Sequence, residues 1–465
     1  MSNTWSKIKS ILGGRDQHYA GRAVAISGDG QVIAVGQDLN NKYLDKGPVY
    51  IYKRSGDEWV QIGSGLTGPE RSEFGHSLGL SKNGETLAIG APNSGSGYVY
   101  LYKFVDKKWQ QIGPTLSGKK SGDEFGFSLS ISDDGNIIAI GSRFSDENGQ
   151  NSGSVKIYKN ERGSWSQYGG TINGDKQFDY SGTSLSLSSD GSTIAIGANR
   201  GSHGGNNNQE GKVKIFNIEN NSWKLKGEIV GESPMDDTGF SVSLSSDGLT
   251  VAIGETLDDK STINTGQVRI FKNNSGTWQQ VGSGINGKYA NAYYAHSISL
   301  SADGSRIAIG APYHKGTEKD SGLVEIYENK SGNWIKIFSD TGLKTNRPVG
   351  ERLGYSVSLS DDGKILIAGL PRGNGIYGTG KVNIYSLGDT SKPLITGVSG
   401  LAGDSSSSKN IAHGSNLVHT FKSNETVVWT IEGGADANKF KIDSSSGAVT
   451  FKSSADYHNP TDSDN

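Results

Sequence analysis

Seven similar units follow one another along the chain, and this repetition limits its fold more than any other feature. A turn of the form Ser-x-Asp/Asn-Gly recurs in them, with its glycines 51 to 59 residues apart. These glycines are Gly30, Gly84, Gly135, Gly191, Gly248, Gly304 and Gly363. Each turn lies between two short apolar stretches, which predicts a β-hairpin because glycine accepts the positive φ of a tight turn. A fixed period of this kind is typical of proteins that repeat one structural unit.

Each unit contains two more predicted strands after the hairpin. The third strand follows a glycine, as in PVYIYK after Gly47 and SVKIYK after Gly153. The fourth strand opens with a tryptophan, at Trp59, Trp109, Trp165, Trp223, Trp278 and Trp334. Four short strands per unit predict the blades of a β-propeller, with the tryptophans packed between blades. WD-type repeats do not fit, because they run about 40 residues and carry a Trp-Asp pair.

The seventh unit ends near Ser386 and has no tryptophan strand of its own. Such a strand exists at the other end of the chain, in Trp5-Ser-Lys-Ile. We therefore expect the N-terminal segment to supply the outer strand of the last blade, which closes the ring and removes an exposed sheet edge. The predicted fold class is all-β, with a seven-bladed β-propeller over residues 1–390.

The composition agrees with many short strands and excludes several partners. Apolar residues make up 33 % of the chain, and glycine supplies 68 positions, which is unlike a helical bundle. The formal charge of −2 offers no basic surplus for nucleic acid. There is no cysteine, hence no disulfide or thiolate metal site. No run of about 18 apolar residues occurs, so no membrane insertion is expected, and residues 1–14 lack the apolar core of a secretory signal.

Two short motifs resemble a known repeat family. Phe74-Gly75 and Phe125-Gly126 open predicted inner strands, while Gly90-Ala91-Pro92 and Gly310-Ala311-Pro312 end second strands. Over residues 1–390 the chain resembles the FG-GAP propellers of integrin α-subunits and their bacterial relatives. That resemblance implies an extracellular recognition platform, not an enzyme. Calcium-binding members carry a longer acidic loop where this chain has only Ser188-Ser189-Asp190-Gly191, so no cofactor is expected in the propeller.

Connection lengths suggest where a ligand binds. The connections between strands one and two and between three and four are tight, and they share one face of the ring, the turn face. The long, variable connections share the opposite face, the loop face, where binding residues usually lie. The candidate ligand-binding residues near the ring axis and in these loops are Tyr19, Glu73, Glu124, Asp179, Tyr180, Asp237, Asp258, Asp259, Tyr293, Tyr313 and Arg352. They could bind a sugar, a cation or a basic side chain, or merely hydrogen-bond the loops.

No catalytic residue is predicted. The eight histidines are scattered, and His76 and His296 occupy matching places in two units, as repeat variants do. No His-x-x-x-His pair, nucleophile elbow or phosphate loop occurs. An enzyme that acts on polysaccharide through carboxylates on the loop face stays open as an alternative, because sequence does not show which carboxylates meet across the ring.

The C-terminal part has a different character. Residues 391–409 are rich in Gly and Ser and are predicted to be a linker. Residues 410–465 resemble bacterial cadherin-like repeats, in Ile431–Asp436, Phe440–Asp443 and Asp456–Pro460. The resemblance implies a partial β-sandwich whose later strands would follow residue 465. It also implies a candidate calcium site whose ligands would be Asp436, Asp456, Asp462 and Asp464. His458 stands where the family usually has glutamate, and these carboxylates could instead cap solvated turns.

Taken together, these features predict a non-catalytic binding or adhesion module. Its ligand would be a glycan or protein of a cell surface or matrix, bound on the loop face. The propeller is expected to be monomeric and to belong to a larger surface or secreted protein, with an extracellular location. A purely structural spacer is the third hypothesis.

Overall fold

The computed structural model describes strands, turns and loops over most of the chain. The described residues are 4–13, 19–37, 47–56, 58–199, 210–234, 236–257, 265–316, 320–343, 350–372, 379–388, 417–420, 440–446 and 448–451. The chain contacts divide it into two units, one of Trp5–Leu387 and one of Met1–Thr4 with Gly388–Asn465. All regular elements among the described residues that exceed a single bridge are β-strands. The all-β, seven-bladed prediction is confirmed.

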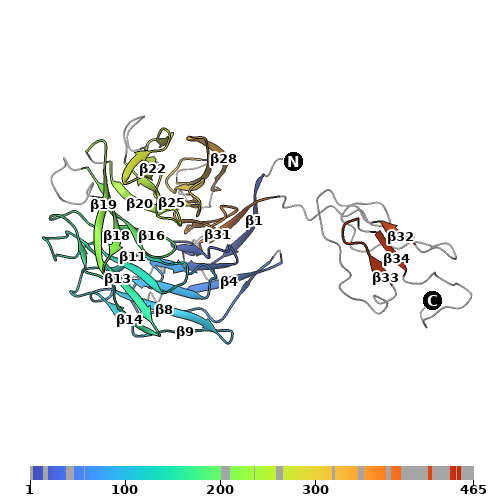
Figure 1. The fold of residues 1–465 in the computed structure, drawn as a ribbon, viewed down its shortest axis with the longest axis horizontal. Coiled ribbons are helices and arrows are strands. Elements are labelled where there is room, and N and C mark those ends of the chain that lie inside the picture. The colour runs from blue at the N-terminus through green and yellow to red at the C-terminus, as the bar shows by residue number, and fades with distance from the viewer. Residues whose placement is uncertain are drawn as a thin grey trace, which may run out of the picture. The chain divides into compact units, whose positions relative to one another are not determined.

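Four antiparallel strands, ordered from the ring axis outwards, form each blade (Figure 1). Blade 1 contains β2 (Val24–Ile26), β3 (Val32–Gly36), β4 (Val49–Ser55) and β5 (Glu58–Gln61). Blade 2 contains β6 (Ser77–Leu80), β7 (Thr86–Ala91), β8 (Tyr98–Val105) and β9 (Lys108–Gln111). Blade 3 contains β11 (Phe125–Ile131), β12 (Ile137–Ser142), β13 (Ser154–Glu161) and β14 (Ser164–Gln167). Blade 4 contains β16 (Ser184–Leu187), β17 (Thr193–Ala198), β18 (Lys212–Glu219) and β19 (Ser222–Val230).

The remaining blades repeat this arrangement. Blade 5 contains β20 (Thr238–Leu244), β21 (Thr250–Glu255), β22 (Gln267–Asn274) and β23 (Thr277–Gln280). Blade 6 contains β25 (Ser297–Leu300), β26 (Arg306–Ala311), β27 (Leu323–Lys330) and β28 (Asn333–Thr341). Blade 7 contains β29 (Val357–Leu359), β30 (Ile365–Leu370), β31 (Lys381–Leu387) and the N-terminal β1 (Trp5–Leu12). Short strands β10 (Leu116–Ser117), β15 (Ile172–Asn173) and β24 (Ile285–Asn286) pair with the third strands of blades 2, 3 and 5.

The core lies between neighbouring blades. The second strand of a blade is mostly apolar and is buried on both faces, as in TIAIGA of β17, because a blade lies against each side of it. The third strand alternates, as in β8, where every second residue of its first half is buried. This difference in patterning follows from position, since the outer part of a blade faces solvent.

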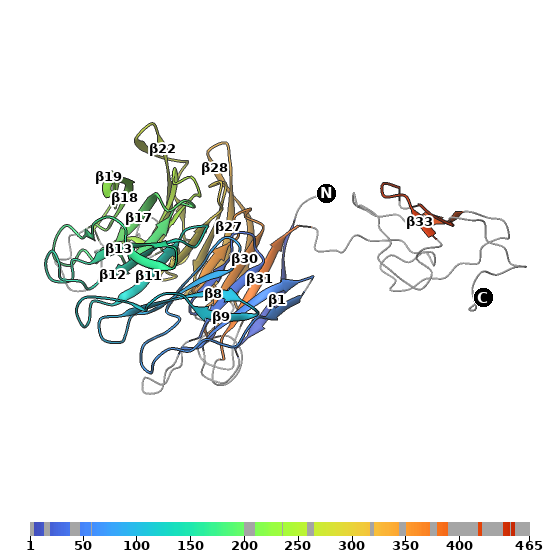
Figure 2. The same ribbon diagram turned by 60° about the horizontal axis from the view of Figure 1, so that its bottom comes forward.

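Ring closure occurs as the sequence predicts. Strand β1 pairs antiparallel with β31, from Trp5 opposite Leu387 to Leu12 opposite Lys381, and the two strands run side by side in both views (Figure 1, Figure 2). The Trp5 side chain is only 9 % exposed and belongs to a cluster with Val324 and Ile326 of blade 6. The N-terminal strand therefore completes blade 7 and also covers its neighbour.

The predicted packing of tryptophans between blades is confirmed. Trp109 packs in a cluster with strands of blade 1, and its Nε1 donates to the carbonyl of Ile62, 3.2 Å away. Trp223 and Trp334 donate in the same way to the outer strand of the preceding blade. A Cβ on Gly63 would lie 2.9 Å from the Trp109 ring, so glycine is required there for the indole to approach the backbone.

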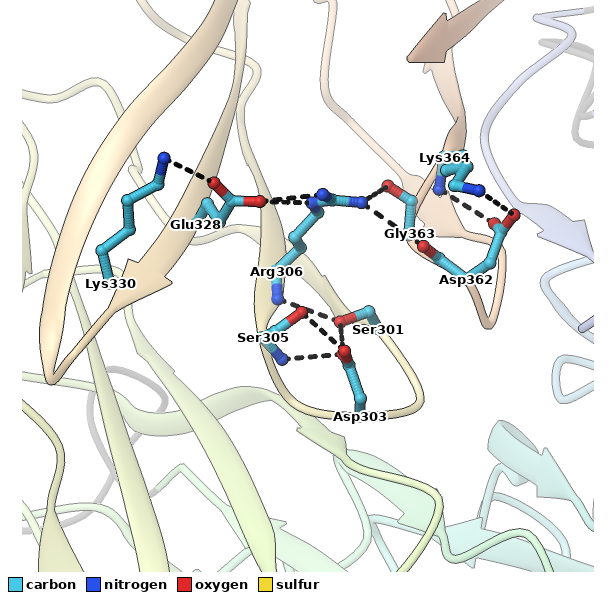
Figure 3. Close-up of polar contacts among 9 residues, drawn as sticks. All are labelled: Ser301, Asp303, Ser305, Arg306, Glu328, Lys330, Asp362, Gly363 and Lys364. Carbon is cyan, nitrogen blue, oxygen red and sulfur yellow. Dashed lines mark hydrogen bonds and ion pairs between the residues drawn. The ribbon is translucent and has the colours of Figure 1, made fainter. Parts of the chain in front are cut away.

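The recurring turn joins neighbouring blades as well as neighbouring strands. Figure 3 shows the turn of blade 6, in which the Ser301 hydroxyl donates to Asp303 Oδ1 over 2.6 Å. The Arg306 side chain extends from this hairpin between the Glu328 carboxylate and the backbone of the next turn. Its Nη2 lies 2.8 Å from Glu328 Oε1 in the same blade. Its Nη1 lies 3.4 Å from the Gly363 carbonyl in the turn of blade 7.

A belt of backbone hydrogen bonds runs around the axis on the turn face. The residue after the turn serine donates its N–H to the carbonyl of its counterpart in the next blade, over 2.8 to 3.0 Å. These pairs are Lys82–Asp133, Asp133–Ser189, Ser189–Ser246, Ser246–Ala302, Ala302–Asp361 and Asp361–Gly28. The Asp29 N–H completes the circle by donating to the Lys82 carbonyl over 3.0 Å. The belt thus links all seven blades of the described propeller through their main chains.

Serine hydroxyls form a second level of contacts between inner strands. Each donates to a backbone carbonyl in the following blade, over 2.6 to 2.9 Å. The serines are Ser77, Ser128, Ser184, Ser241, Ser297 and Ser356. The equivalent residue of blade 1 is Ala23, which has no hydroxyl. Among the described inner strands, the junction of blades 1 and 2 is therefore the one without this bond.

The second unit contains a three-stranded antiparallel sheet. Its strands are β32 (Leu417–Thr420), β33 (Phe440–Ile442) and β34 (Ala448–Phe451), in the order β32-β34-β33. The Asp443 carboxylate accepts the N–H groups of Ser445 and Ser446 and so shapes the turn between β33 and β34. The predicted linker 391–409 and the candidate calcium ligands Asp436, Asp456, Asp462 and Asp464 lie outside the described residues, and the cadherin-like repeat stays a prediction.

We predict that Trp5→Ala destabilises the whole propeller. The substitution leaves a cavity between blades 6 and 7 and should lower the free energy of unfolding by about 3–5 kcal/mol. Leu12→Ala on the same strand is the matched control, because Leu12 is 54 % exposed, and its effect should stay within about 0.5 kcal/mol. Chemical denaturation measures both variants. Equal stabilities of the two variants would contradict a closing role for β1.

The serine level yields a second prediction. Ser241→Ala removes the donor to the Ala295 carbonyl, 2.7 Å away, and should cost about 1–2 kcal/mol because that carbonyl loses its partner in a buried place. Ala23→Ser supplies the absent hydroxyl opposite Gly75 and should stabilise by about 1 kcal/mol. Melting temperatures that move the same way in both variants would show that these hydroxyls do not hold the blades together.

Candidate ligand pocket on the loop face

A four-residue turn leads into the inner strand of every blade. Its first residue adopts a positive φ of 34° to 60°, although none of the seven is glycine. These first residues are Tyr19, Glu73, Glu124, Tyr180, Asp237, Tyr293 and Arg352. The third residue also has positive φ and is glycine, except for Ala295 in blade 6. A positive φ at the third residue is the requirement of a type II turn.

The last residue of each turn lines a cavity on the ring axis. These residues are Arg22, His76, Phe127, Thr183, Phe240, His296 and Tyr355. Four first residues, Glu73, Glu124, Tyr180 and Asp237, also line it, as do Pro92, Asn93, Arg143, Phe144 and Asn199 from the ends of second strands. The cavity has a volume of about 450 Å³, within the range that holds small ligands. The repeat therefore places one side chain from every blade around a common space.

An ion-paired group from blades 1 and 2 forms one part of the wall. Glu73 Oε2 lies 3.0 Å from His76 Nδ1 and 3.5 Å from Arg22 Nη2. The hydrogen bond from His76, with the positive charge of Arg22, lowers the pKa of Glu73 to about 2. Burial lowers the pKa of His76. At neutral pH the group therefore consists of a carboxylate, a neutral imidazole that donates to it, and a guanidinium.

A second ion pair adjoins the first one in blade 3. Arg143 Nε donates to Glu124 Oε2 over 2.7 Å. The Arg143 guanidinium also lies over two rings, 3.6 Å from the Phe127 centroid and 4.5 Å from the Phe144 centroid. A cation held on aromatic faces and by a carboxylate keeps one orientation. Arg143 is thus a preorganised donor at the pocket wall.

An aromatic group from blades 5, 6 and 7 forms another part of the wall. The His296 ring centroid lies 5.2 Å from that of Phe240 and 4.7 Å from that of Tyr355. His296 Nδ1 donates to the Tyr355 carbonyl over 3.0 Å, because a carbonyl can only accept. Burial, together with the charge of Arg352, lowers the pKa of His296 to about 4. The three rings are therefore uncharged at neutral pH.

The structure brings only part of the predicted set into the pocket. Asp237 lies there and is 3 % exposed, and it accepts the Thr256 hydroxyl over 3.3 Å. Asp179 is fully buried and accepts the N–H groups of Asp175 and Lys176, so it shapes a blade-to-blade loop. Asp258 and Asp259 lie outside the described residues.

Other predicted residues form a separate contact beside the pocket. The Tyr313 ring lies 5.0 Å from the Tyr293 ring, with the Arg352 guanidinium 4.5 Å from its centroid. Arg352 also pairs with Asp320 over 3.3 Å. Tyr19, Tyr293, Tyr313 and Arg352 are not among the residues that line the cavity.

Sequence reasoning missed the last residues of the turns. It located the first residue of each turn, and the pocket residue follows three positions later, before an alternating inner strand. That fixed spacing could have identified the pocket residues. The first and third residues determine the backbone conformation of the turn, whereas the type of the last residue differs between blades. Arg143 and Phe144 had a weaker signal, namely their place after a second strand.

The described part of the chain contains no group of three histidine or carboxylate side chains placed to hold a metal ion. It also contains no helix of the length and apolarity that crossing a bilayer requires.

We predict that acid destabilises the propeller through His296. Its pKa is about 4 in the fold and near 6.5 in the unfolded chain, so the unfolded chain binds more protons between these values. The free energy of unfolding should be highest above pH 6.5. It should decrease by up to about 3 kcal/mol as the pH drops to 4. Burial also lowers the pKa of His76, so His76 should add to the loss of stability in acid.

Denaturation curves from pH 7.5 to 4 measure this effect. His296→Gln should flatten the pH dependence between 6.5 and 4. The pKa of Glu73 is lowered from 4.5 to about 2 in the fold, so this carboxylate affects stability between those two values and Glu73→Gln should alter the pH dependence chiefly below pH 4.5. An unchanged slope in His296→Gln would refute the assignment.

Comparisons with known proteins support the fold. Residues 115–158 match the sequence model of the FG-GAP repeat, and a search of curated proteins found no match. A protein described as a 6-phosphogluconolactonase from Bacteroides uniformis is similar, with 15 % identity and a TM-score of 0.52 over 81 % of this chain and 95 % of that chain. Hydrazine synthase from Kuenenia stuttgartiensis has 12 % identity and a TM-score of 0.49 over 77 % and 94 %. At 15 % identity the likeness to the Bacteroides uniformis protein shows the fold alone, and this chain is a seven-bladed β-propeller with one segment that matches the FG-GAP repeat.

Proposed function

We propose that the propeller is a non-catalytic binding module whose ligand enters the axial pocket on the loop face. The observation that carries this proposal is the contrast between positions within one turn. The third residue is glycine or alanine in all seven described turns. The last residue, which faces the pocket, is Arg, His, Phe, Thr, Phe, His and Tyr in blades 1 to 7. Within one chain, the scaffold positions repeat and the pocket positions diverge.

Backbone strain is present in every described turn around the same pocket, and it also occurs at described residues elsewhere, such as Asp106, Asn220 and Ser331. A non-glycine residue at positive φ costs on the order of 1 kcal/mol, and one occurs at the start of every described inner turn. Strain of this kind persists where the surrounding structure fixes it, often at binding sites. Here it presents Glu73, Glu124, Tyr180 and Asp237 to the cavity.

The chemistry of the pocket favours binding over catalysis. A general acid needs a pKa near the working pH, whereas the pKa of Glu73 is about 2 and that of His296 about 4. Glu124 is occupied by Arg143. These are fixed hydrogen-bonding groups and aromatic faces, which suit recognition. A polysaccharide-acting enzyme is the alternative, and the product assay below separates the two.

The wider setting belongs to the same proposal. The resemblance of residues 410–465 to cadherin-like repeats supports an extracellular protein of adhesive function, in which the propeller would be monomeric. Its partner would be a glycan or protein of a cell surface or matrix. Calcium would bind in the C-terminal part, through Asp456, Asp462, Asp464 and Asp436.

We predict saturable binding of the chain of residues 1–465 on an array of glycans and matrix proteins, run with calcium and with chelator. Arg143→Gln and Phe240→Ala should abolish the signal, because both side chains line the pocket. Lys330→Ala is the control, since Lys330 is 60 % exposed on the turn face.

Two outcomes would contradict the proposal. One is binding that survives both pocket substitutions, which would place the ligand elsewhere. The other is release of reducing ends from a polysaccharide that depends on Glu73 or Glu124, which would favour the enzyme.

A further inference from the structure

The pocket wall has two chemically different sides. Ring order places blade 6 across the axis from blades 2 and 3, while blades 7 and 1 are neighbours. The first side, which we call the aromatic arc, consists of Phe240, His296 and Tyr355. The second side, the ionic arc, consists of Arg22 with Glu73 and of Arg143 with Glu124. The rings of Phe127 and Phe144 accompany Arg143 on this side, and Asp237 lies in the same turn as Phe240 of the aromatic arc. A ligand that fills the pocket must therefore present an apolar face and a polar edge.

We infer that the pocket takes an uncharged sugar residue at the end of a glycan, stacked on the aromatic arc and hydrogen-bonded to the ionic arc. This inference rests on the proposed binding function and names its ligand class. A sugar ring carries C–H groups on one face and hydroxyls around its edge. It is thus amphipathic in the way that the pocket is.

The aromatic arc offers a continuous apolar surface. Its three rings contact one another in sequence, with centroids 5.2 and 4.7 Å apart. His296 belongs to this surface because it is uncharged at neutral pH, and its bond to the Tyr355 carbonyl fixes the ring plane. Aromatic faces of this kind pack against the C–H face of a ligand while exposed polar groups stay wet.

The ionic arc offers acceptors and donors side by side. The carboxylates of Glu73 and Glu124 can only accept, and the guanidinium groups of Arg22 and Arg143 can only donate. A sugar hydroxyl does both, so one hydroxyl can bridge a carboxylate and a guanidinium. Arg143 keeps its orientation between Phe127 and Phe144, which reduces the entropy that ordering it on binding would cost.

The balance of charge argues against an ionic ligand. Three carboxylates and two guanidinium groups line the cavity, and both histidines have lowered pKa values. An anionic sugar would meet Glu73, Glu124 and Asp237, and a basic side chain would meet Arg22 and Arg143. The negative and positive charges of the pocket differ in number by only one. A neutral ligand avoids repulsion both from the carboxylates and from the guanidinium groups.

The enclosure of the cavity by the seven blades favours a ligand that is the end of a glycan chain. Side chains from all seven blades line the cavity, so a polymer can enter along the axis but cannot lie across it. A volume of about 450 Å³ is at the low end of the range for small-ligand sites and suits a terminal sugar residue with a part of its neighbour.

Calorimetry on the chain of residues 1–465 tests this inference. The probes are neutral methyl glycosides and short neutral oligosaccharides, the matching uronate and sulfated sugars, and an arginine-rich peptide. We expect saturable binding of at least one neutral sugar, with the charged probes at least tenfold weaker. Blocking the non-reducing end of the preferred oligosaccharide should abolish binding if that end is the one bound, and substitution at the reducing end should otherwise do so.

Substitutions in each arc separate the contributions. Phe240→Ala should weaken sugar binding at least tenfold, whereas Phe240→Tyr should retain it, because it keeps the ring. Arg143→Gln should also weaken binding at least tenfold, and Lys330→Ala should leave it unchanged. Melting curves confirm that each variant is folded, and the Phe240→Tyr protein keeps the test valid if Phe240→Ala is unstable.

Three outcomes would overturn the inference. Preference for an anionic sugar or for the peptide would reassign the ligand class, while pocket-dependent binding of a protein alone would leave the proposed binding function standing without the sugar. Neutral sugar binding that persists in both arc variants would move the sugar site elsewhere. Absence of any binding, on the array and in calorimetry, would overturn both the inference and the proposed function.

Discussion

Closure of the ring is the constraint on which the other features depend. Blade 1 and blade 7 share one core cluster, in which Ile33 packs with Ile367 and Ile384, so an open chain would expose that apolar surface to water. The contacts that hold this junction include the pairing of β1 with β31, the Asp361 N–H to the Gly28 carbonyl, and the Ser356 hydroxyl to the Gly21 carbonyl. The partners are hundreds of residues apart in sequence, which makes closure a property of the finished ring.

The same architecture makes the pocket variable without endangering the fold. Each inner turn is fixed by its third residue and by a serine that follows the last residue in six of the seven described blades. The last residue itself lines the axial pocket, and its type differs between blades. The last residue is Thr183 in blade 4 and Phe240 in blade 5, although the turn is the same in both blades. A repeat protein can therefore acquire a ligand by altering seven positions.

Pairing of charges gives the pocket its chemical character. Glu73 would be a strong cation attractor alone, but His76 and Arg22 hold it. Arg143 would attract anions alone, but Glu124 and two aromatic rings hold it. The result is a wall of fixed donors and acceptors with little net charge. Such a wall selects ligands by the geometry of hydrogen bonds more than by long-range attraction.

The sequence by itself determined the repeat, the four strands of each blade, the closing strand at Trp5 and the packing of the tryptophans. These features follow from local rules, because glycine turns, alternation and period are written along the chain. It also located Glu73, Glu124, Tyr180 and Asp237 by their matching places.

Only the tertiary structure decided which side chains share the pocket. It separated Glu73 from Asp179, and it united Phe240, His296 and Tyr355, which lie more than 50 residues apart from one another along the chain. The direction of a side chain depends on the φ of its own turn and on the rotation of each blade about the ring axis. Neither quantity is encoded in the residue type at that position.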